Sequence, residues 1–505
     1  MNVSDALGSA LDGDDWQAVN RLIDDHFFRL LFTQPDLLLQ AFDTAPPQWY
    51  ADHPRNLMSS TIAELVRKST STLDLTRVQA FRDWVESQPS PAMRDVLGIQ
   101  MVKLRDLVAH GWFADASALA DGVLNMIRTA PEREEGLRDV QPQVLLSCGV
   151  AKLLNGEVDA AAPFFSEAIR WSTIGDEHPF AVYAREHLAL VHALEERYAE
   201  ASALLGEQPA MLSPSNTLQH VYEPAGLLAR LLVAAASLDS AGLGRGLDEL
   251  DSSVYDGDLG WIALHARSLL ALIDGNPLSA IHRIHTVLST TAHRTPPATL
   301  AGSVLRADLA ALYQAAGDLR AAEKMLSSPS RGPHSSRPGV VIPTARQALL
   351  RGRPNLALSL LQQDERSDTV MTPGRYTPSG AVLYASAELA VTGTLGASAL
   401  ELAVTTVNHH RAHGALMNAS PELRQLLFGQ IDYAFEVPQP WVYRARIKLT
   451  PREQEILRAL QTHPTINMVA ASLHVSPNTA KTHIRALYRK LGAHTRDEAI
   501  WLGNE

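Results

Sequence analysis

Residues 449–505 read LTPREQEILRALQTHPTINMVAASLHVSPNTAKTHIRALYRKLGAHTRDEAIWLGNE. Three residues of this stretch can cap the start of a helix, because their side-chain oxygens accept backbone N–H groups: Thr450, Ser476 and Thr495. Proline follows the first two at the first helical position, where no N–H is needed. The second predicted helix, residues 466–473, ends in the short turn 474–476. Two short helices joined by a tight turn are typical of a helix-turn-helix.

The third predicted helix, which begins after Ser476, has two different faces. At about 100° per residue, four apolar side chains fall on one narrow stripe: Ala480, Ile484, Leu487 and Leu491. The opposite face carries cationic, amide and hydroxyl side chains: Asn478, Lys481, Thr482, Arg485 and Arg489. We expect the stripe to pack on the core of a small domain. The opposite face would then reach phosphates and base edges in a DNA major groove.

Charge is distributed unevenly along the chain. The whole sequence has 44 basic and 55 acidic residues, for a net charge of −11. Residues 449–505 contain seven of the basic and five of the acidic residues, so they carry +2 and the rest of the chain carries −13. Residues 478–491 contain four cations and no anion. An acidic body with one small cationic helix is the layout expected of a protein that meets nucleic acid at one end.

A larger set of positions carries a family resemblance. It comprises Leu449-Thr450-Pro451-Arg452-Glu453, Glu455-Ile456-Leu457, Ala470, Leu473, Val475-Ser476, Thr479, Lys481, His483, Lys490-Leu491-Gly492, Arg496 and Glu498-Ala499. With these residues the stretch resembles the DNA-binding domain of the LuxR family of bacterial transcription regulators. Ala480 replaces the usual Val, and residues 466–469 replace a more polar start of the second helix. The resemblance implies a small four-helix, LuxR-type helix-turn-helix domain over residues 447–505.

Three kinds of DNA contact are expected from the third helix. Lys481 and Arg485 would reach base edges, because long cationic side chains fit the acceptor edges of guanine. Asn478 and Thr482 would reach bases or phosphates. The residues expected at phosphates alone are Thr479, Arg489 and Lys490.

The last predicted helix, residues 495–502, has more apolar surface than so short a helix can bury on its own domain. The side chains concerned are Ala499, Ile500, Trp501 and Leu502. The family resemblance implies that this helix pairs two domains. We therefore expect a homodimer on DNA that reads inverted half-sites about 34–36 Å apart. The alternative is that Ile500 and Trp501 fold back onto the first helix of the domain.

The chain before residue 449 is rich in Leu and Ala at helical spacing. Helix breaks recur at positions 111, 156, 196, 236, 275, 317, 352 and 393. Five positions after each break stands a small residue: Ala116, Ala161, Ala201, Ala241, Ala280, Ala322, Ala357 and Ser398. One turn later stand Ala120, Phe165, Leu205, Arg245, Ile284, Leu326, Leu361 and Leu402. A small residue followed by a larger apolar one suits closely packed antiparallel helices, so the pattern predicts an all-α array of stacked hairpins.

The clearest copy of this pattern has Gly149 in its first helix, Gly156 at the break, and then Ala161 and Phe165. This copy resembles the tetratricopeptide repeat. The resemblance implies a helical-hairpin superhelix, which we place at residues 1–435, followed by a linker at 436–446. The alternative is an irregular helical domain. Three stretches fit no helix pair and are expected to be loops, namely residues 131–143, 328–343 and 366–380.

Other classes of protein are less consistent with the sequence. The helical start differs from the alternating βα pattern of a receiver domain, and no lysine follows a glycine, which excludes a G-x-x-x-x-G-K phosphate loop. The opening Gly13-Asp14-Asp15-Trp16 resembles the start of the helical region in large maltose-activator-type regulators, here without their ATP-binding module. No nucleophile–base motif stands out. Two sets of histidines have the spacing of ligands on a helix, His282 with His285, and His409 and His410 with His413, but neither has an acidic or cysteine partner at matching spacing. We therefore expect no enzyme activity, cofactor or metal site.

The sequence thus predicts a DNA-binding transcriptional regulator whose helical region senses an effector or docks a partner. With Cys148 as its single cysteine and no apparent signal peptide or long apolar run, the protein is expected in the cytoplasm, away from membranes. Its partners would be double-stranded promoter DNA, RNA polymerase and an unknown effector or protein. The alternative is an interaction scaffold whose helix-turn-helix contacts protein. Four cations on an anion-free helix argue against that alternative.

Overall fold

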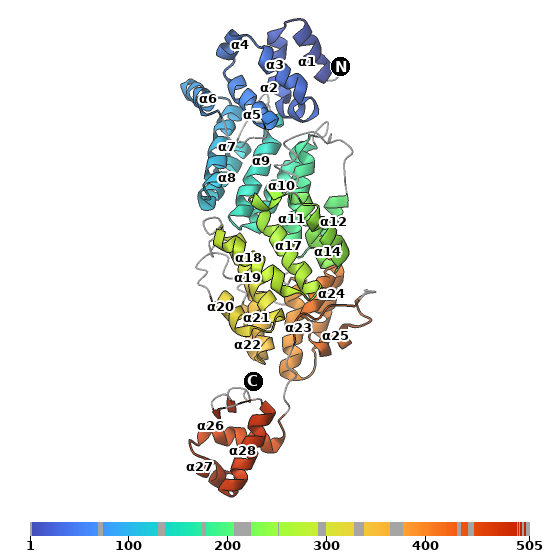
Figure 1. Ribbon diagram of the computed structural model, residues 1–505. Coiled ribbons are helices and arrows are strands. Elements are labelled where there is room, and N and C mark those ends of the chain that lie inside the picture. The colour runs from blue at the N-terminus through green and yellow to red at the C-terminus, as the bar shows by residue number, and fades with distance from the viewer. Residues whose placement is uncertain are drawn as a thin grey trace. The chain divides into compact units, whose positions relative to one another are not determined.

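The computed structural model describes residues 3–68, 74–129, 137–173, 178–206, 224–250, 252–290, 299–327, 338–363, 377–431, 436–442, 449–491, 493, 495–496 and 499–500. Throughout these ranges the secondary structure is α-helical apart from one short 3-10 helix, and no β-strand occurs in them, which confirms the all-α prediction (Figure 1). Within the same ranges no helix has the length and hydropathy needed to cross a membrane. The chain divides into two compact units, residues 1–270, 282–305 and 330–334, and residues 271–281, 306–329 and 335–505.

The first unit begins with six helices that precede the paired helices. These are α1 (Val3–Asp12), α2 (Trp16–Thr33), α3 (Pro35–Thr44), α4 (Pro47–Asp52), α5 (Arg55–Lys68) and α6 (Leu75–Ser87). Asp15 caps α2 by accepting the N–H of Ala18 at 3.0 Å, as its position before the helix favours. Trp49 packs edge-on against Trp16, with ring centroids 5.7 Å apart.

A kink in α2 is stabilised by a residue more than a hundred positions away. His26 has non-helical backbone angles, so the N–H groups just after it lose their helical acceptors. The buried carboxylate of Asp139 accepts one of them, from Phe28, at 2.8 Å. The same carboxylate accepts from Nε2 of buried His178 at 3.2 Å, whose Nδ1 accepts the N–H of Phe180 at 3.3 Å. Asp139 thus ties α2 to two later parts of the unit.

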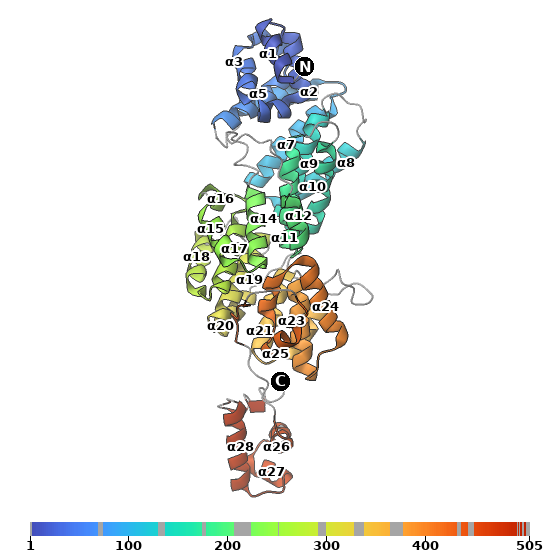
Figure 2. The same cartoon turned by 90° about the vertical axis from the view of Figure 1, so that its right-hand side faces the viewer.

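Four helix pairs follow in the first unit. They are α7 (Met93–Ala109) with α8 (Phe113–Thr129), α9 (Leu137–Leu154) with α10 (Val158–Ser172), α11 (Phe180–Leu194) with α12 (Tyr198–Gly206), and α14 (Pro224–Ala236) with α15 (Ser240–Asp248). A short helix, α16 (Ser252–Asp256), comes after them. Consecutive helices from α7 to α12 pack against one another, and they lie side by side in both views (Figures 1 and 2).

The rest of the helical region continues the pairing. Its helices are α17 (Gly260–Ile273), α18 (Pro277–Thr290), α19 (Leu300–Ala315), α20 (Leu319–Leu326), α21 (Pro338–Leu350), α22 (Pro354–Gln363), α23 (Pro378–Thr392) and α24 (Ala397–His410). The 3-10 helix η1 (His413–Asn418) and α25 (Pro421–Leu427) follow. From α20 to α24 each helix packs on the next.

Each predicted helix break lies at, or two residues before, a residue with a left-handed backbone. These residues are Gly111, Gly156, Glu196, Leu238, Gly275, Gly317, Gly352 and Gly393. Seven coincide with the predicted positions, and the fourth lies two residues later than expected, at Leu238 in place of 236. A left-handed residue ends the first helix of a pair and turns the chain back, which is why glycine occupies most of these positions.

Two predicted packing positions are wrong because the local register is shifted. Ala241 and Ser398 are exposed, although small residues were expected to be buried there. In the fourth pair the break at Leu238 moves the buried positions two residues on, to Leu243 and Leu247, and leaves Arg245 exposed. In the last pair, residues added between Gly393 and the start of α24 shift the buried small residue to Ala399.

The pair α9–α10 shows why its first helix has a glycine opposite a phenylalanine of its second helix. A Cβ atom added to Gly149 would lie 2.5 Å from Cε1 of the Phe165 ring, closer than packed atoms approach. Phe165 and Ala161 are both fully buried. The Phe165 ring therefore occupies the space that a side chain at position 149 would need.

All three predicted loops are shorter than expected, since residues 378–380 of the third belong to α23. Residues 137–143 belong to α9 and residues 338–343 to α21, with Pro142 and Pro343 inside the helices. Each proline is the sixth residue of its helix, so the helix continues through it with one i to i−4 hydrogen bond missing in its second turn. The remaining parts of these stretches, 131–136 and 328–337, lie outside the described residues, as do 366–376 of the third.

A buried lysine joins the second helix pair to the first. Lys152 of α9 is almost completely buried, and its ammonium lies 2.8 Å from Asp121, 3.0 Å from Glu157 and 2.9 Å from the Ser117 hydroxyl. Desolvation would raise the pKa of Glu157, but hydrogen bonds from Ser117, Lys152 and Asn155 hold it below its ordinary value. All three donor positions of the ammonium are thus satisfied inside the unit.

Candidate nucleic-acid interface

The C-terminal domain contains three described helices, α26 (Pro451–Thr462), α27 (Ile466–Ser472) and α28 (Pro477–Leu491). Thr450 caps α26 as predicted, and the cap is a full capping box, because Thr450 accepts the N–H of Glu453 and the Glu453 carboxylate accepts the N–H of Thr450 at 2.7 Å. Ser476 caps α28 by accepting the N–H of Thr479 at 3.1 Å. Two of the three predicted helix starts are confirmed; Glu498, which would complete the third, lies outside the described residues.

The turn between α27 and α28 is built on a left-handed residue other than glycine. His474 has a φ of 54°. Beyond it, the N–H of Val475 bonds to the carbonyl of Ala470 at 3.0 Å and closes the end of α27. This arrangement sets the direction in which α28 leaves the turn.

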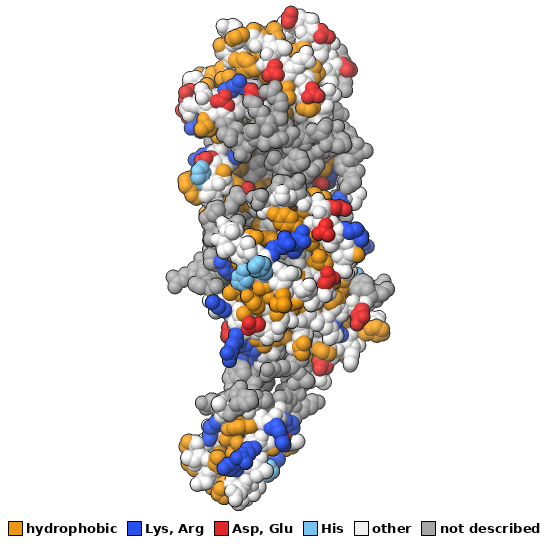
Figure 3. Space-filling model, in the orientation of Figure 1, with side chains coloured by type: hydrophobic (Ala, Val, Ile, Leu, Met, Phe, Trp, Pro, Cys, Tyr) orange, Lys and Arg blue, Asp and Glu red, His pale blue; other side chains and the backbone are white. Residues whose placement is uncertain are grey.

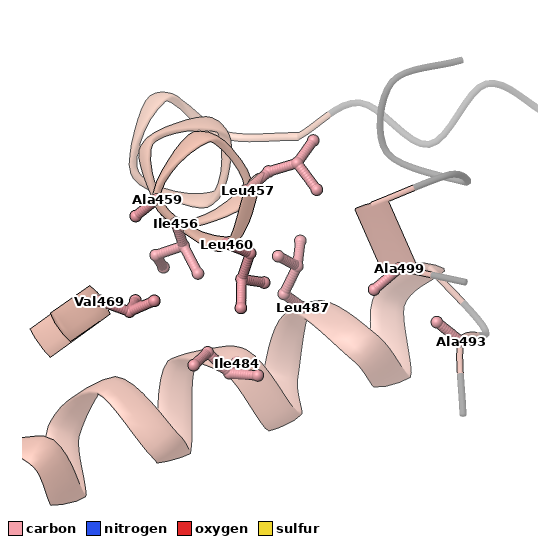
Figure 4. Packing of buried hydrophobic residues seen from close by; sticks show 9 residues of the cluster. All are labelled: Ile456, Leu457, Ala459, Leu460, Val469, Ile484, Leu487, Ala493 and Ala499. Carbon is pink, nitrogen blue, oxygen red and sulfur yellow. The ribbon is translucent and has the colours of Figure 1, made fainter. Parts of the chain in front are cut away.

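Three helices meet in the small apolar core of this domain (Figure 4). Its buried members are Ile456, Leu457, Ala459, Leu460, Val469, Ile484, Leu487, Ala493 and Ala499. Ala480 is buried as well, so Ala480, Ile484 and Leu487 confirm the predicted apolar stripe of α28. The side chain of Leu491, its fourth member, lies outside the described set.

The face of α28 opposite the stripe is exposed over its whole length. Its exposed side chains are Asn478, Lys481, Thr482, Arg485 and Arg489. Figure 3 shows Lys and Arg side chains gathered on this domain. No hydrogen bond or ion pair joins Lys481, Arg485 or Arg489 to any other described residue. Their charges are therefore fully available to an anionic partner.

Two threonine hydroxyl groups near the start of α28 make local hydrogen bonds. Thr479 Oγ1 lies 2.8 Å from the capping hydroxyl of Ser476, and Thr482 donates its hydroxyl to the carbonyl of Asn478 at 3.0 Å. A hydroxyl that donates within its helix keeps its acceptor lone pairs. Thr482 in this arrangement presents an acceptor to an approaching donor.

Lys490 has a different environment from the other cations of α28. Its ammonium lies 2.6 Å from the carboxylate of Glu453, the residue that also closes the capping box of α26. The Lys490 ammonium and the Thr450 N–H hold the pKa of Glu453 below its ordinary value. Lys490 therefore links the last turn of α28 to the first turn of α26.

Arg496 has a structural contact that the sequence alone did not reveal. Its guanidinium donates to the carbonyls of Leu460, His463 and Pro464, which end α26. A cation at a helix C-terminus satisfies orphan carbonyls and interacts favourably with the helix dipole. The long separation between Arg496 and these carbonyls leaves no local sequence signal for the contact.

The predicted dimerisation residues occupy different environments. Ala499 is fully buried in the core of the domain, and Ile500 packs partly against that core. Ala499 therefore has no surface to offer a second copy of the chain. Trp501 and Leu502 lie outside the described residues.

The start of α27 is apolar where the family resemblance implied a more polar sequence. Val469 points into the core and is fully buried, whereas Ile466 and Met468 are 38% and 47% exposed. Thr465 caps this helix by accepting the N–H of Met468 at 3.3 Å. The departure thus changes the surface of α27 and leaves its cap in place.

Residues 448–502 match the family described as bacterial regulatory proteins, luxR family. Similar proteins include a probable transcriptional regulatory protein NarL of Mycobacterium tuberculosis, 42% identical over 52 residues, and a probable csgAB operon transcriptional regulatory protein of Salmonella typhimurium, 40% identical over 57 residues. A nitrate/nitrite response regulator protein homolog of Haemophilus influenzae is 44% identical over 54 residues.

The family match lies in the C-terminal domain, and the matches to the three relatives are equally short. They cover 10%, 11% and 11% of this chain and 24%, 26% and 26% of the three proteins, so the chain spans about a quarter of the length of the relatives it matches. They confirm that residues 448–502 form a LuxR-type helix-turn-helix domain, a DNA-binding domain of transcription regulators. The helical region before it has no counterpart in these matches.

Proposed function

We propose that the chain is a sequence-specific DNA-binding transcriptional regulator. Its C-terminal domain would place α28 in the major groove of promoter DNA. Its helical region would sense an effector or dock a partner, and RNA polymerase would be the partner on the promoter. The protein would act in the cytoplasm as a homodimer on DNA.

The observation that carries this proposal is the exposed cationic face of α28. Lys481, Arg485 and Arg489 extend from one side of a helix whose other side is buried, and no described residue neutralises them. Association with phosphates releases condensed counterions, so such charges favour DNA strongly. A scaffold that contacts protein through this helix has no comparable need for three uncompensated cations.

The individual roles follow from position on the helix. Lys481 lies in the first half of α28, the part of a recognition helix that meets base edges, and Arg485 lies one turn further along the same exposed face. Asn478 and Thr482 would contact bases or phosphates beside them. Thr479, Arg489 and Lys490 would contact phosphates, and Lys490 would then exchange its bond to Glu453 for a phosphate contact.

The test compares base-reading residues with a cation elsewhere on the domain. A binding site is first selected by mapping bound DNA across a genome, and affinities are then measured on that site and on random DNA. Lys481→Ala and Arg485→Ala should each weaken binding to the selected site by about 1–3 kcal/mol and to random DNA much less. Arg458→Ala, which removes an exposed cation from α26, is the control and should leave this difference unchanged.

Two outcomes would contradict the assignment. Equal losses on both DNAs would mean that Lys481 and Arg485 position the protein without reading sequence. If no selected site emerges and the variants bind DNA as the unmodified chain does, the scaffold function replaces the regulator.

Dimerisation would rest on Ile500, Trp501 and Leu502, since Ala499 is buried. The double variant Trp501→Glu, Leu502→Glu should stay folded by circular dichroism and occupy single half-sites weakly. If these side chains fold back onto the first helix of the domain, the variant should unfold. A folded variant that binds a full inverted repeat at unmodified strength would overturn the dimer.

For the helical region we propose a tetratricopeptide-like array. Support comes from the left-handed break in each helix pair and from the close approach of Gly149 to Phe165. Stacked pairs of this kind form extended binding surfaces. Deleting the C-terminal domain and measuring what the remaining chain captures would test whether this region recognises a partner by itself.

A further inference from the structure

The chain that leads toward the C-terminal domain is held against the helical region. Arg424 of α25 donates from Nη1 to the carbonyl of Val437 at 2.8 Å and from Nη2 to the carbonyl of Pro438 at 2.9 Å. The same guanidinium donates to the carbonyls of Met417 and Ala419 at the end of η1. One side chain therefore fastens two residues of the predicted linker to the body of the second unit.

A second attachment lies three residues further on. Trp441 is 4% exposed, and its indole N–H donates to the carbonyl of Ala311 in α19 at 3.1 Å. The guanidinium carbon of Arg346 in α21 lies 3.8 Å from the centroid of the Trp441 ring. The next residue, Val442, is 85% exposed. Trp441 is thus the last buried residue of the described segment 436–442.

The seat of Trp441 is itself well ordered by hydrogen bonds. Arg346 is buried and donates from Nε to the side-chain oxygen of Asn418 at 2.9 Å and from Nη1 to that of Gln314 at 3.2 Å. Gln314 in turn donates to the carbonyl of Pro343 at 2.9 Å. A guanidinium fixed in this way presents a flat cationic surface to an aromatic ring.

We propose that Trp441 is a positioning residue for the DNA-binding domain. The edge of its indole donates to α19 and its face lies against Arg346 of α21, so it fixes a point of the chain eight positions before Leu449. A ligand or partner that alters the spacing of α19 and α21 would release or move this starting point. The inference rests on the proposed function for its effect on DNA, although the attachment itself does not.

The number of residues between an attachment point and Leu449 gives the expected size of the effect. From Trp441 to Leu449 are eight Cα–Cα steps, which span at most about 28 Å. If Trp441 leaves its seat, the tether begins at Pro438 and spans at most about 39 Å. If the Arg424 clamp is also lost, it begins at buried Ile431 and spans at most about 63 Å.

The experiment measures distances in the full chain without DNA. Spin labels are placed at Glu401→Cys in α24 and Gln454→Cys in α26, which are both exposed. Cys148 needs no replacement, because burial raises the pKa of its thiol and hides it from the label. Pulsed electron paramagnetic resonance then gives the distribution of distances between the label on the helical region and the label on the C-terminal domain.

Trp441→Ala should move the long-distance limit of this distribution outward by up to about 11 Å. Adding Arg424→Met should move it further. Trp441→Phe, which keeps a ring over Arg346, should resemble the unmodified chain. A two-residue insertion after Val442 calibrates the response, and Trp261→Ala controls for loss of a buried tryptophan elsewhere.

A Trp441→Ala distribution that superimposes on the unmodified one, in a chain folded by circular dichroism, would overturn the proposal. If Trp441→Ala does not fold, Trp441→Leu fills part of the seat without donating to Ala311 or stacking on Arg346, and the same comparison is made. Because no DNA is present, failure of the regulator function would leave these distances unchanged. Conversely, Trp441→Ala should not alter binding of the C-terminal domain to a single half-site.

Discussion

The helical region and the C-terminal domain place their charged side chains in opposite ways. In the helical region Asp139, Lys152 and Arg346 are buried and hydrogen-bonded to other parts of the chain. In the described part of the C-terminal domain no charged side chain is buried, and the cations of α28 face outward.

This difference separates two uses of charge. A buried ion costs desolvation free energy and persists where its partners are fixed, so it determines how helices are joined. An exposed cation contributes little to folding and retains its charge for a partner. The contrast therefore predicts that charge removal destabilises the helical region, whereas in the domain it weakens binding.

The strongest test of the contrast is Lys152→Met. The variant keeps an apolar stem of similar length but leaves Glu157 without its ammonium partner, and it should lower the free energy of unfolding by about 3 kcal/mol. Lys103→Met, an exposed lysine of α7, is the matched control and should change it by less than about 0.5 kcal/mol. Denaturant titration measures both.

The same variant should also change the pH dependence of stability. The pKa of Glu157 is lower in the folded chain than in the unfolded chain. Glu157 therefore adds to the free energy of unfolding above its ordinary pKa, and this stabilisation is lost as the pH falls through its pKa in the folded chain. The difference between Lys152→Met and the unmodified chain should therefore shrink below about pH 4. A difference that stays constant as the pH falls well below that value would show that Glu157 does not carry the effect.

Gly149→Ala sharpens the comparison for packing. The added methyl group overlaps the Phe165 ring, so the unfolding free energy should fall by about 1–3 kcal/mol. Gly122 lies in α8, and a methyl group added there would meet no atom within 4 Å, so Gly122→Ala should instead raise it by about 0.5–1 kcal/mol. Thermal unfolding that shifts in the same direction for both variants would contradict the close-packing argument.

Lys490 combines the two uses of charge, because it joins two helices through Glu453 and is also expected to contact DNA phosphates. Lys490→Ala should lower the unfolding free energy by up to about 1 kcal/mol, because an exposed ion pair with Glu453 is lost. It should also weaken binding to all DNA sequences and flatten the salt dependence by about 0.9 in log–log slope.

Glu453→Gln is the matched variant, since it removes the same ion pair and keeps the cation. It should reduce stability similarly and leave the salt slope of DNA binding unchanged. If Lys490→Ala leaves the salt slope of DNA binding unchanged, Lys490 does not contact phosphate and only links α28 to α26.

The smallest expected effect compares the turns of the two regions. Most helix pairs turn on a left-handed glycine, whereas the helix-turn-helix turns on His474 at φ 54°. His474→Gly removes the strain of a side chain in this conformation and adds the entropy of glycine to the unfolded chain, for a net gain of about 0.5 kcal/mol. If the unfolding transition of the C-terminal domain shows that His474→Gly is less stable, the His474 imidazole makes a contact that outweighs the backbone strain.

The parts of the fold that local sequence determines were predicted well. Helix caps such as Thr450 and breaks such as Gly156 act within a few residues, so their positions follow from residue type. The error at Ala241 arose where this local signal is absent. The turn of the fourth pair lies at Leu238 and no glycine marks it, so its position was inferred from the spacing of the neighbouring pairs.

Contacts between distant residues could not be predicted in this way. Nothing around Asp139 indicates that it caps a kink at His26, and nothing around Trp441 indicates a seat on Arg346. In the candidate interface, the exposed face of α28 followed from helical periodicity, whereas the pairing of Lys490 with Glu453 depends on how α26 and α28 are packed. Periodicity assigns a face to each residue; the partner on that face comes from the tertiary structure.

The cap that Asp139 places on the kinked α2 also has a consequence for the exchange of gene segments. The carboxylate and the N–H of Phe28 that it accepts are separated by 111 positions. Any crossover between two related genes that falls within this interval brings together an α2 and an α9 that have not evolved as a pair. Such recombinants retain every helix of the fold but pair the kink with an unmatched acceptor, so they should be recovered less often than crossovers placed after Phe180.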